Sequence, residues 1–390
     1  MSSAKVKMLG LFLLAIVVRT ILITSFLTRF PDLCQWGTNE MGCVGRSLLL
    51  NHTFSTPYHD ASGPTAWLAP VYPAIVNVIF AVFGIQSSAS AIAVIVLNGL
   101  CSALVSVVLF KMGSEFLSER AGLTAGLLWA VSPAVALVTL LIWDTCLTTL
   151  LATWACLLTL RLALPVRKRS WHSYVLVGGL WALAGLSSPS VLAPLPFLVL
   201  WLWAKTRQFK PTAIFSGASG LVLLPWTLRN FLVFHKLIPV RDKFWAEVFF
   251  ENIGFQTHPL KTSMEYQRLG ELQFIEMAKQ RVLLYIHDHF ADFLQQTLYR
   301  AGQFWILPEG MWRLSFFLSI ATFLGLCVMA KRKLPTALPF LIILAVYPLT
   351  YYVSYTFSRY RHPIEPIMYM SAAFLLVEVG QRFRQNKPVA

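Results

Sequence analysis

Repeated long apolar runs constrain this chain of 390 residues more than any other feature. Several of them approach or exceed the roughly 20 residues that a helix needs to cross a bilayer. The hydrophobic fraction is 57% and only 13% of residues are charged, which is too apolar for a soluble protein of this length. Only helices can satisfy the backbone across so many separate runs. The sequence therefore predicts an all-α polytopic membrane protein.

Apolar runs and the basic residues that follow them predict where each span begins and ends. The short runs at 173–187 and 190–204 flank Ser187-Ser188-Pro189-Ser190 and predict a tight outer hairpin. In all we expect a bundle of about ten transmembrane helices, near residues 8–27, 89–110, 121–140, 145–164, 173–187, 190–204, 212–232, 312–330, 335–357 and 363–380.

The net charge of +15 is distributed by position. The predicted cytoplasmic segments hold 17 Lys/Arg against 3 Asp/Glu, which is nearly all of the excess. That pattern follows the positive-inside rule, so the charge reports topology and not a nucleic-acid partner. We expect an integral protein of a bacterial inner (plasma) membrane with both termini cytoplasmic. The cytoplasmic segments are 1–7, 111–120, 161–172, 205–211, 331–334 and 378–390.

One apolar segment, residues 67–84, conflicts with this topology. If it crossed the membrane, the basic clusters after it would all face outward, against the positive-inside rule. Pro70 and Pro73 also disfavour a straight helix there. We therefore expect a juxtamembrane or re-entrant element on the outer side.

The predicted organisation is one transmembrane domain over residues 1–380, followed by a cytoplasmic tail over 381–390. Two outer regions stand outside the spans. Residues 28–88 form a first outer loop with juxtamembrane elements, and residues 233–311 form one long outer loop. The long loop holds 8 Lys/Arg and 9 Asp/Glu, and apolar residues at helical spacing within 264–300 predict one or two amphipathic helices.

The first outer loop places an acid at the start of an amphipathic segment, in Thr38-Asn39-Glu40-Met41-Gly42. Thr38 or Asn39 can cap this helix. Glu40 then lies in the first turn, where the helix dipole favours an ionised carboxylate. Such a group can accept a proton from an incoming hydroxyl or amine. The alternative is a solvated residue that only caps the helix.

Asp144 is a second acid, next to Trp143 at the predicted outer start of span 145–164. Carboxylates at membrane depth are costly and usually face a cavity or a partner. An interfacial helix cap explains this position equally well.

Arginines on the outer side oppose the positive-inside bias and need another reason. Arg359 and Arg361 lie between two predicted spans, and Arg229 ends another. Guanidinium groups match phosphate oxygens, so these residues predict a phosphate or pyrophosphate site. Pairing with lipid phosphates or with Glu365 is the alternative. Arg19, within the first span, is expected to snorkel to the outer surface.

The cysteines and histidines give weaker indications of a functional site than the charged residues do. Cys34 and Cys43 share the first outer loop and could form a disulfide if the compartment is oxidising. His287 and His289 resemble a metal pair, but residues two apart do not share a helix face. We therefore predict no metal and no cofactor, with a divalent ion between the two outer acids as the alternative.

Four short motifs together resemble the GT-C membrane glycosyltransferases, and within them the glycosyltransferase 39 group. That group includes protein O-mannosyltransferases and the aminoarabinose transferase of lipid A. The run from Gly63 to Pro70 also looks like bacterial members of the group. The four motifs are Thr38-Asn39-Glu40-Met41-Gly42, Ile142-Trp143-Asp144-Thr145, Pro225-Trp226-Thr227-Leu228-Arg229-Asn230 and Arg359-Tyr360-Arg361-His362-Pro363.

The resemblance implies a GT-C-like bundle with outer juxtamembrane helices and a donor that carries its sugar on a polyprenyl phosphate. It gives Glu40 the role of the base that activates the acceptor. Asp144 would orient the acceptor or hold the sugar. The donor phosphate would be bound by Arg359, Arg361 and Arg229.

Two departures from the group's pattern stand out. The group often has an Asp-Glu pair where this chain has Asn39 and then Glu40, which leaves Glu40 alone or helped by Asp32. The group also often supplies a Lys near the entrance to the site, and residues 63–70 contain none.

The expected chemistry is plausible on its own terms. Displacing a phosphate from an anomeric carbon needs a base for the nucleophile and positive charge for the leaving group. The expected function is therefore hexosyl or pentosyl transfer to a lipid, glycan or protein acceptor on the outer face, among membrane lipids. The alternatives are a transporter or flippase of a lipid-linked or small anionic substrate, an outer-leaflet glycan ligase or polymerase, and a scaffold subunit. Transporters usually contain two paired halves with broken helices in matching positions. We find no such symmetry in this sequence, which argues against a transporter.

Overall fold

The computed structural model describes residues 3–29, 39–58, 63–164, 170–253, 259–306 and 312–385. Within these residues every regular element is a helix, apart from an isolated bridge between Ser55 and Pro64. Seven of the described helical segments are long and apolar enough to cross a membrane. The prediction of an all-α polytopic membrane protein is therefore confirmed.

Six of the predicted spans are single helices. They are α1 (Ser3–Arg29), α4 (Ser88–Phe116), α7 (Thr145–Leu162), α8 (Trp171–Ser187), α10 (Phe209–Phe234) and α15 (Trp312–Lys331).

The other four predicted spans are interrupted. Prolines lie at or beside these breaks, because a proline cannot donate to the preceding turn. The pieces are α5 (Glu119–Val131) with α6 (Pro133–Val138), η1 (Pro189–Leu192) with α9 (Leu195–Thr206), α16 (Ala337–Val346) with α17 (Leu349–Val353), and α18 (Ser358–Arg361) with η3 (His362–Ile364) and α19 (Glu365–Gln385).

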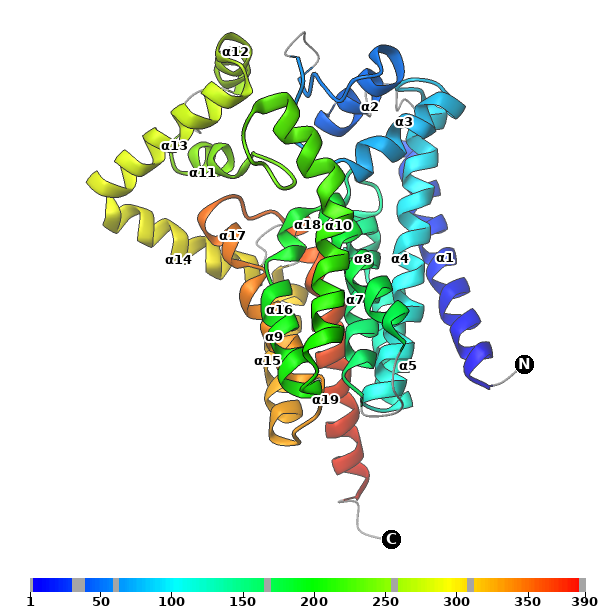
Figure 1. Cartoon of the computed structure of the whole chain (residues 1–390). Helices are drawn as coiled ribbons and strands as arrows, with labels where there is room; N and C mark the ends of the chain where they lie inside the picture. Colours follow the sequence, from blue (N-terminus) through cyan, green and yellow to red (C-terminus); the bar gives the residue numbers. More distant parts are fainter. Residues whose placement is uncertain are drawn as a thin grey trace.

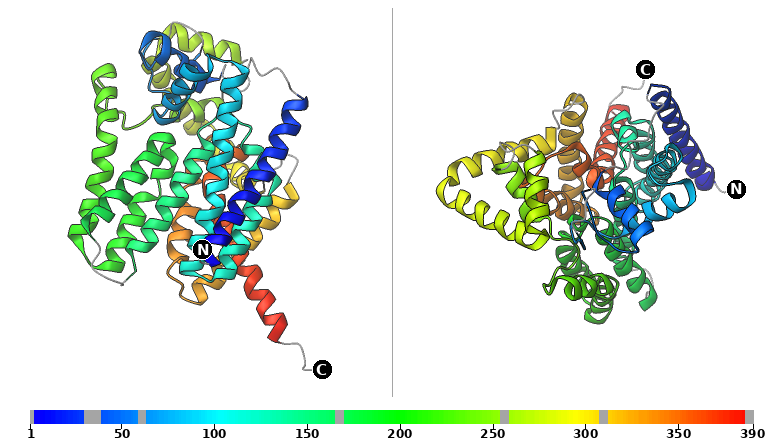
Figure 2. Two further views of the ribbon diagram at one scale, coloured as in Figure 1. Left: turned by 90° about the vertical axis from the view of Figure 1, so that its right-hand side faces the viewer. Right: turned by 90° about the horizontal axis from the view of Figure 1, so that it is seen from above.

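The long helices run side by side along one axis, and α1 leans across the outside of the bundle (Figures 1 and 2). Both described ends of the chain lie toward the lower end of Figure 1. The core is formed mainly by α4, α5, α7, α8 and α19. This arrangement agrees with an even number of crossings. The side of the membrane that the lower end faces stays a prediction.

Glycines allow two of the closest helix contacts. A side chain at Gly178 on α8 would overlap the carbonyl of Phe215 on α10. A side chain at Gly325 on α15 would overlap the carbonyl of Ser371 on α19. Small residues let helix backbones approach closely, which is the usual way that helices associate inside a membrane.

The upper end of the bundle carries a cap of shorter helices (Figure 1). Its first part, from the first outer loop, is α2 (Glu40–Asn51) and α3 (Val71–Phe83). Its second part, from the long loop, is α11 (Phe244–Asn252), α12 (Pro259–Leu269), α13 (Glu271–Asp288) and α14 (Phe290–Ile306).

Helix α3 is the helical part of the segment at 67–84. Its 13 residues extend about 20 Å, which is less than the roughly 30 Å of a hydrocarbon core. It packs against α2, where Val76 lies against Gly45. These features support a juxtamembrane position, and the outer location stays a prediction.

Arg19 does not snorkel, and that expectation is wrong. Its side chain is 1% exposed inside the bundle. It donates to the carbonyls of Trp129 and Ala130 and to Ser102 Oγ, the last at 3.0 Å. Those carbonyls are the last of α5, which ends before Pro133 and lacks helical donors for them. Arg19 therefore caps a broken helix.

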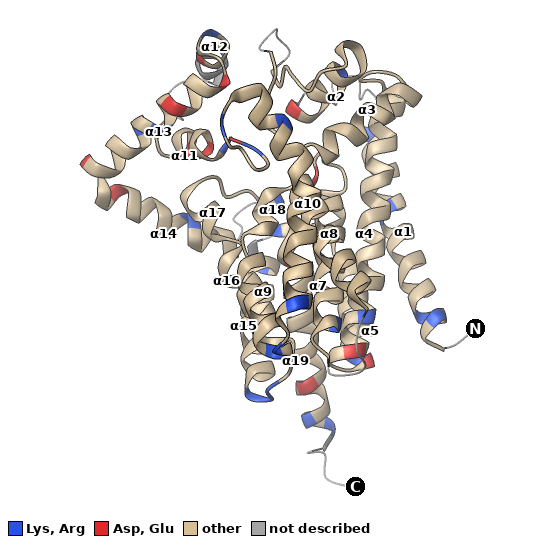
Figure 3. Ribbon diagram, in the orientation of Figure 1, with Lys and Arg blue, Asp and Glu red and all other residues tan. Residues whose placement is uncertain are grey.

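The charged residues lie mostly at the two ends of the bundle. Figure 3 shows Lys and Arg at its lower end and again in the loops beside α10 and α18. Between these ends the helices are largely uncharged. If the upper end faces outward as predicted, its Lys and Arg residues are the ones that oppose the positive-inside bias.

The topology can be tested with single cysteines in a variant in which all six native cysteines, including Cys34 of the first outer loop and the exposed Cys327, are replaced by serine. We expect a membrane-impermeant maleimide added to intact cells to label Gln86→Cys, in the turn between α3 and α4. Lys333→Cys, in the turn after α15, should react only after the cells are permeabilised. Labelling of both positions from the same side would refute the predicted topology.

Candidate functional site

A small charged cavity lies between the cap and the upper end of the bundle. Its volume is about 40 Å³. Trp143 and the tyrosines Tyr347, Tyr351 and Tyr360 form part of its wall. Three acids and three cations among the described residues also line it: Glu40, Asp144, Glu247, Arg241, Lys243 and Arg359.

Asn39 sets the position of the first acid. Its side-chain oxygen accepts from the backbone N–H of Gly42 at 3.0 Å, which caps α2 as predicted. Its amide nitrogen donates to the carbonyl of Ile142 at 2.9 Å. A carboxylate could cap the helix but could not donate to that carbonyl. The Asn therefore joins the start of α2 to the segment that carries Asp144.

Glu40 is the most completely bonded acid of the cavity. Lys243 Nζ lies 2.9 Å from each of its carboxylate oxygens, and Trp67 Nε1 donates to Oε1 at 2.9 Å. Tyr58 donates a further hydrogen bond. Burial acts to raise the pKa of Glu40, but the Lys243 ammonium and these hydrogen bonds outweigh it and hold the pKa below its usual value.

Asp144 lies at the N-terminus of α7 but makes no capping bond with its side chain. Instead it lines the cavity and receives a hydrogen bond from Ser188. Burial raises its pKa to about 6, although the charges of Arg241 and Arg359 act in the opposite direction. Unlike Glu40, it has no cation within ion-pair distance among the described contacts.

Arg359 presents an unsatisfied donor. Its guanidinium carbon lies 4.0 Å from the centre of the Trp143 ring, and Nη2 donates weakly to the Tyr360 hydroxyl at 3.3 Å. Its Nε is buried and has no hydrogen-bond partner among the residues that the structure describes. Buried donors are seldom left without a partner. An anion in the cavity would supply the missing acceptor.

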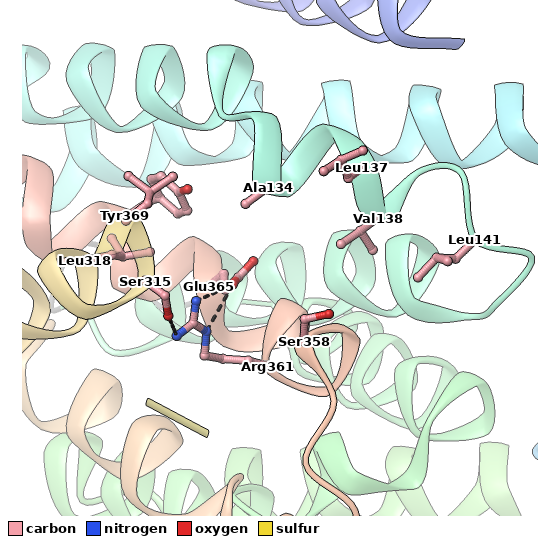
Figure 4. Close-up of a pocket in the computed structure, with 11 residues that line it drawn as sticks. Ala134, Leu137, Val138, Leu141, Ser315, Leu318, Ser358, Arg361, Glu365 and Tyr369 are labelled. Carbon is pink, nitrogen blue, oxygen red and sulfur yellow. Dashed lines mark hydrogen bonds and ion pairs between the residues drawn. The ribbon is translucent and has the colours of Figure 1, made fainter. Parts of the chain in front are cut away.

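Arg361 is not brought to this cavity. It is 2% exposed and its guanidinium bonds to Glu365, to Ser315 Oγ at 2.6 Å and to the carbonyl of Trp305. Figure 4 shows Glu365 and Ser315 beside it. Arg359 and Arg361 are two residues apart on α18, so they point to different sides. The expectation of two arginines on one phosphate is therefore not met in this structure.

Arg361 lines a different hollow, an apolar groove of about 250 Å³ between α6, α15 and α19. Leu137, Val138 and Leu141 line it on one side and Leu318 of α15 on the other (Figure 4). Leu314 of α15 also lines it. Leu141 and Ser358 of the groove precede Trp143 and Arg359 of the cavity in the chain. The groove and the cavity are therefore neighbours.

Arg229 also lies outside the cavity. Its Nη1 donates to the carbonyl of Thr65 at 2.8 Å and its Nη2 to the carbonyl of Phe54 at 2.9 Å. Its guanidinium carbon lies 5.0 Å from the centre of the Trp226 ring. Its contacts hold the first outer loop against α10, which differs from the phosphate-binding role expected from the sequence.

Glu271 holds the same loop from the other side. Its carboxylate accepts from Thr65 Oγ1, from the backbone N–H of Ala66 at 2.6 Å and from the Tyr266 hydroxyl at 2.6 Å. Burial raises its pKa, although these hydrogen bonds act in the opposite direction. The clamped segment continues into Trp67, which bonds to Glu40. Two charged residues outside the cavity, the half-buried Arg229 and the buried Glu271, thus fix the position of the acid inside it.

Three cavity residues were not expected from the sequence. Arg241 lies 3.7 Å from Glu247, and Lys243 pairs with Glu40. Arg241 and Lys243 follow α10 in the run Pro239-Val240-Arg241-Asp242-Lys243, and Glu247 lies in α11. All three belong to the long loop, where positive and negative charges nearly cancel. The missing lysine near the entrance was the available clue, because Lys243 supplies a cation there from a different loop.

The remaining sequence expectations concern other parts of the chain. Cys34 and Asp32 lie outside the described residues, so the disulfide with the buried Cys43 and the help from Asp32 stay predictions. His287 is exposed at the end of α13 and bonds to Asp288. Within the described residues, no group of three or more His, Cys, Asp or Glu side chains is arranged to hold a metal ion.

Comparison with known sequences points to one family over part of the chain. Residues 66–228 match the model of the family described as dolichyl-phosphate-mannose-protein mannosyltransferase. This match covers less than half of the chain and contains Asp144, while Glu40 and Arg359 lie outside it. No curated protein matches the chain in sequence.

Comparison with solved structures points to one fold over nearly all of the chain. The apo oligosaccharyltransferase of Archaeoglobus fulgidus matches with a TM-score of 0.56 and 14% identity, over 97% of this chain and 51% of that one. The same enzyme in complex with an inhibitory peptide and a dolichol-phosphate matches with a TM-score of 0.55 and 12% identity, over 98% and 52%. The chain thus spans about half the length of these proteins.

The two comparisons confirm the resemblance to the GT-C membrane glycosyltransferases. The chain is a polytopic membrane protein with the GT-C fold. At this level of identity the structural likeness shows the fold and leaves the roles of individual residues to be argued from the cavity.

Proposed function

We propose that the chain is a membrane glycosyltransferase that moves a sugar from a polyprenyl-phosphate donor to an acceptor at the cap end of the bundle. The observation that carries this proposal is the cavity itself. It holds Glu40 and Asp144 opposite Arg359, beside an apolar groove. A carboxylate for the nucleophile and cations for a phosphate leaving group are what this displacement needs.

The donor would lie across the boundary between groove and cavity. Its isoprenoid chain suits the apolar groove between α6, α15 and α19. Its phosphate would reach the unpartnered Nε of Arg359. The family match, whose description names a dolichyl-phosphate mannose, supports a donor of this kind. So does the dolichol-phosphate bound to the structural relative.

The reaction then involves one displacement. Glu40 takes the proton of the acceptor hydroxyl or amine, and the freed electron pair forms the bond to the anomeric carbon. The bond from that carbon to the phosphate oxygen breaks, and its electrons stay on the phosphate. Arg359 stabilises the charge of the departing lipid phosphate. Asp144 accepts a hydrogen bond from the acceptor or from the sugar, which orients the reacting groups.

We further propose that this end of the bundle faces outward from a bacterial inner membrane. The sugar can be a hexose or a pentose, and the acceptor a lipid, a glycan or a protein. The product can be found by mass spectrometry of envelope lipids, glycans and proteins from cells with and without the gene. A mass difference of one sugar on a single class would define the acceptor.

Glu40→Gln is expected to abolish sugar transfer, because the amide cannot take the proton. Protein level should stay close to wild type and thermal stability should fall only slightly, since the amide oxygen can still accept from Trp67 and from the Lys243 ammonium. The matched control is Glu115→Gln, which removes an exposed partner of Arg161 at the lower end. Sugar transfer by the Glu40 variant at the wild-type rate would refute the assignment of the base.

Arg359→Met is expected to raise the donor KM about tenfold or more, the usual effect of losing a charged hydrogen bond, with little change in the acceptor KM. Arg361→Met should instead lower thermal stability, because it leaves Glu365 unpaired in the interior. The comparison needs initial rates and an unfolding curve for each variant. An unchanged donor KM in the Arg359 variant would remove that residue from the phosphate site.

Asp144 predicts how transfer depends on pH. Because the pKa of its carboxyl is raised to about 6, the carboxylate is present above that pH and is lost as the pH falls through it. We expect the transfer rate to decline in step below about pH 6. Asp144→Asn should transfer slowly with this decline removed, and Asp242→Asn, outside the cavity lining, should keep it. A decline that persists in the Asp144 variant would assign it to another group.

A further inference from the structure

Lys243 creates a conflict with the role of Glu40. A general base needs a free lone pair directed at the proton that it takes. In the structure both carboxylate oxygens bond to the Lys243 ammonium, and Trp67 and Tyr58 donate to the same carboxylate. A carboxylate held in this way is a weak base, because protonation would break the ion pair. The cation must therefore leave before Glu40 can act.

The three cations of the cavity differ in how firmly they are held. The guanidinium of Arg359 lies over the Trp143 ring, 4.0 Å from its centre. Arg241 lies near Glu247 and experiences the charge of Asp144. Lys243 is a point charge on a flexible stem, with its Nζ 5.0 Å from the centre of the Trp67 ring, and among the described residues its one ion pair is with Glu40. It is therefore the cation that can change partners at least cost.

We propose that Lys243 serves two anions in turn: it bonds to Glu40 in the empty site and moves to the lipid phosphate when the donor binds. Binding of the donor thereby uncovers the base. The inference rests on the proposed function, and it adds an order of events, in which the acceptor is activated only after the donor is in place.

The surroundings of Glu40 allow this exchange. Trp67 and Tyr58 still donate to the carboxylate after Lys243 leaves, so Glu40 keeps its position. The Lys243 charge is the chief influence that lowers the pKa of Glu40. Its departure raises that pKa and makes Glu40 a stronger base, while the phosphate gains a second cation beside Arg359.

The exchange predicts that loss of the Glu40 charge strengthens phosphate binding through Lys243, and this can be measured without sugar transfer. The probe is undecaprenyl phosphate, and its affinity for the purified full chain in lipid nanodiscs can be measured by native mass spectrometry. Lys243→Met should weaken binding about tenfold. Glu40→Gln should strengthen it about tenfold, because it releases Lys243 for the phosphate. In the Lys243→Met background, Glu40→Gln should have almost no effect.

The control separates this competition from the general loss of a negative charge. Glu247→Gln removes an acid of the same cavity that pairs with Arg241, so its effect on binding should be the same with and without Lys243→Met. If Lys243→Met does not yield a monodisperse protein, Lys243→Gln replaces it in both cycles.

Each outcome decides the matter. Weaker or unchanged binding by Glu40→Gln overturns the exchange, and so does a gain that persists in the Lys243 variant. In either case the proposed function stands if the wild type binds the probe. Failure of the wild type to bind undecaprenyl phosphate at all would count against the proposed donor, and the exchange would fall with it.

Discussion

Charge balance at the end of an apolar bundle governs the arrangement of the cap. Ionised groups withdrawn from water are tolerated only when they are paired and hydrogen-bonded. Three acids and three cations meet in one cavity, so the segments that carry them must converge there. These segments are α2, the start of α7, the loop after α10, α11 and α18. The hydrogen bonds that Arg229 and Glu271 make beside the first outer loop serve the same requirement outside the cavity. Convergence of these segments leaves the site walled by charge and aromatic rings.

The fold was largely predictable because a bilayer accepts few solutions. Apolar runs of sufficient length located the spans, and the distribution of Lys and Arg argued against counting 67–84 among them. The hydrogen-bond partners of individual buried residues could not be predicted from the sequence. Arg19 looked like a snorkelling residue because no pattern shows that α5 ends within its reach. The break before Pro133, and the carbonyls that it leaves open, are visible only once α1 and α5 are side by side.

A site residue was predictable from the sequence where its charge is unusual for that position in a membrane protein. Glu40, Asp144 and Arg359 stand where charges are unexpected for a membrane protein, and the structure brings them together. Arg361 violates the same rule, but the two-residue spacing turns it toward Glu365 and the apolar groove. Lys243 and Arg241 were missed because a long loop carries charges of both signs without penalty. Only their distance from Glu40 and Asp144 gives them significance.

The division between bundle and cap has a consequence for how the protein would lose activity on heating. The cavity depends on α2 and on the segment around Lys243, which are short and pack outside the main core, α2 through Met41 and Val44 in a smaller apolar cluster. Segments of this kind open locally at a lower free energy than the packed core. Inactivation would then precede loss of helix content, and it would be reversible as long as the helices behind the cavity remain in place. Loss of function and loss of fold would thus be two separate events in one molecule.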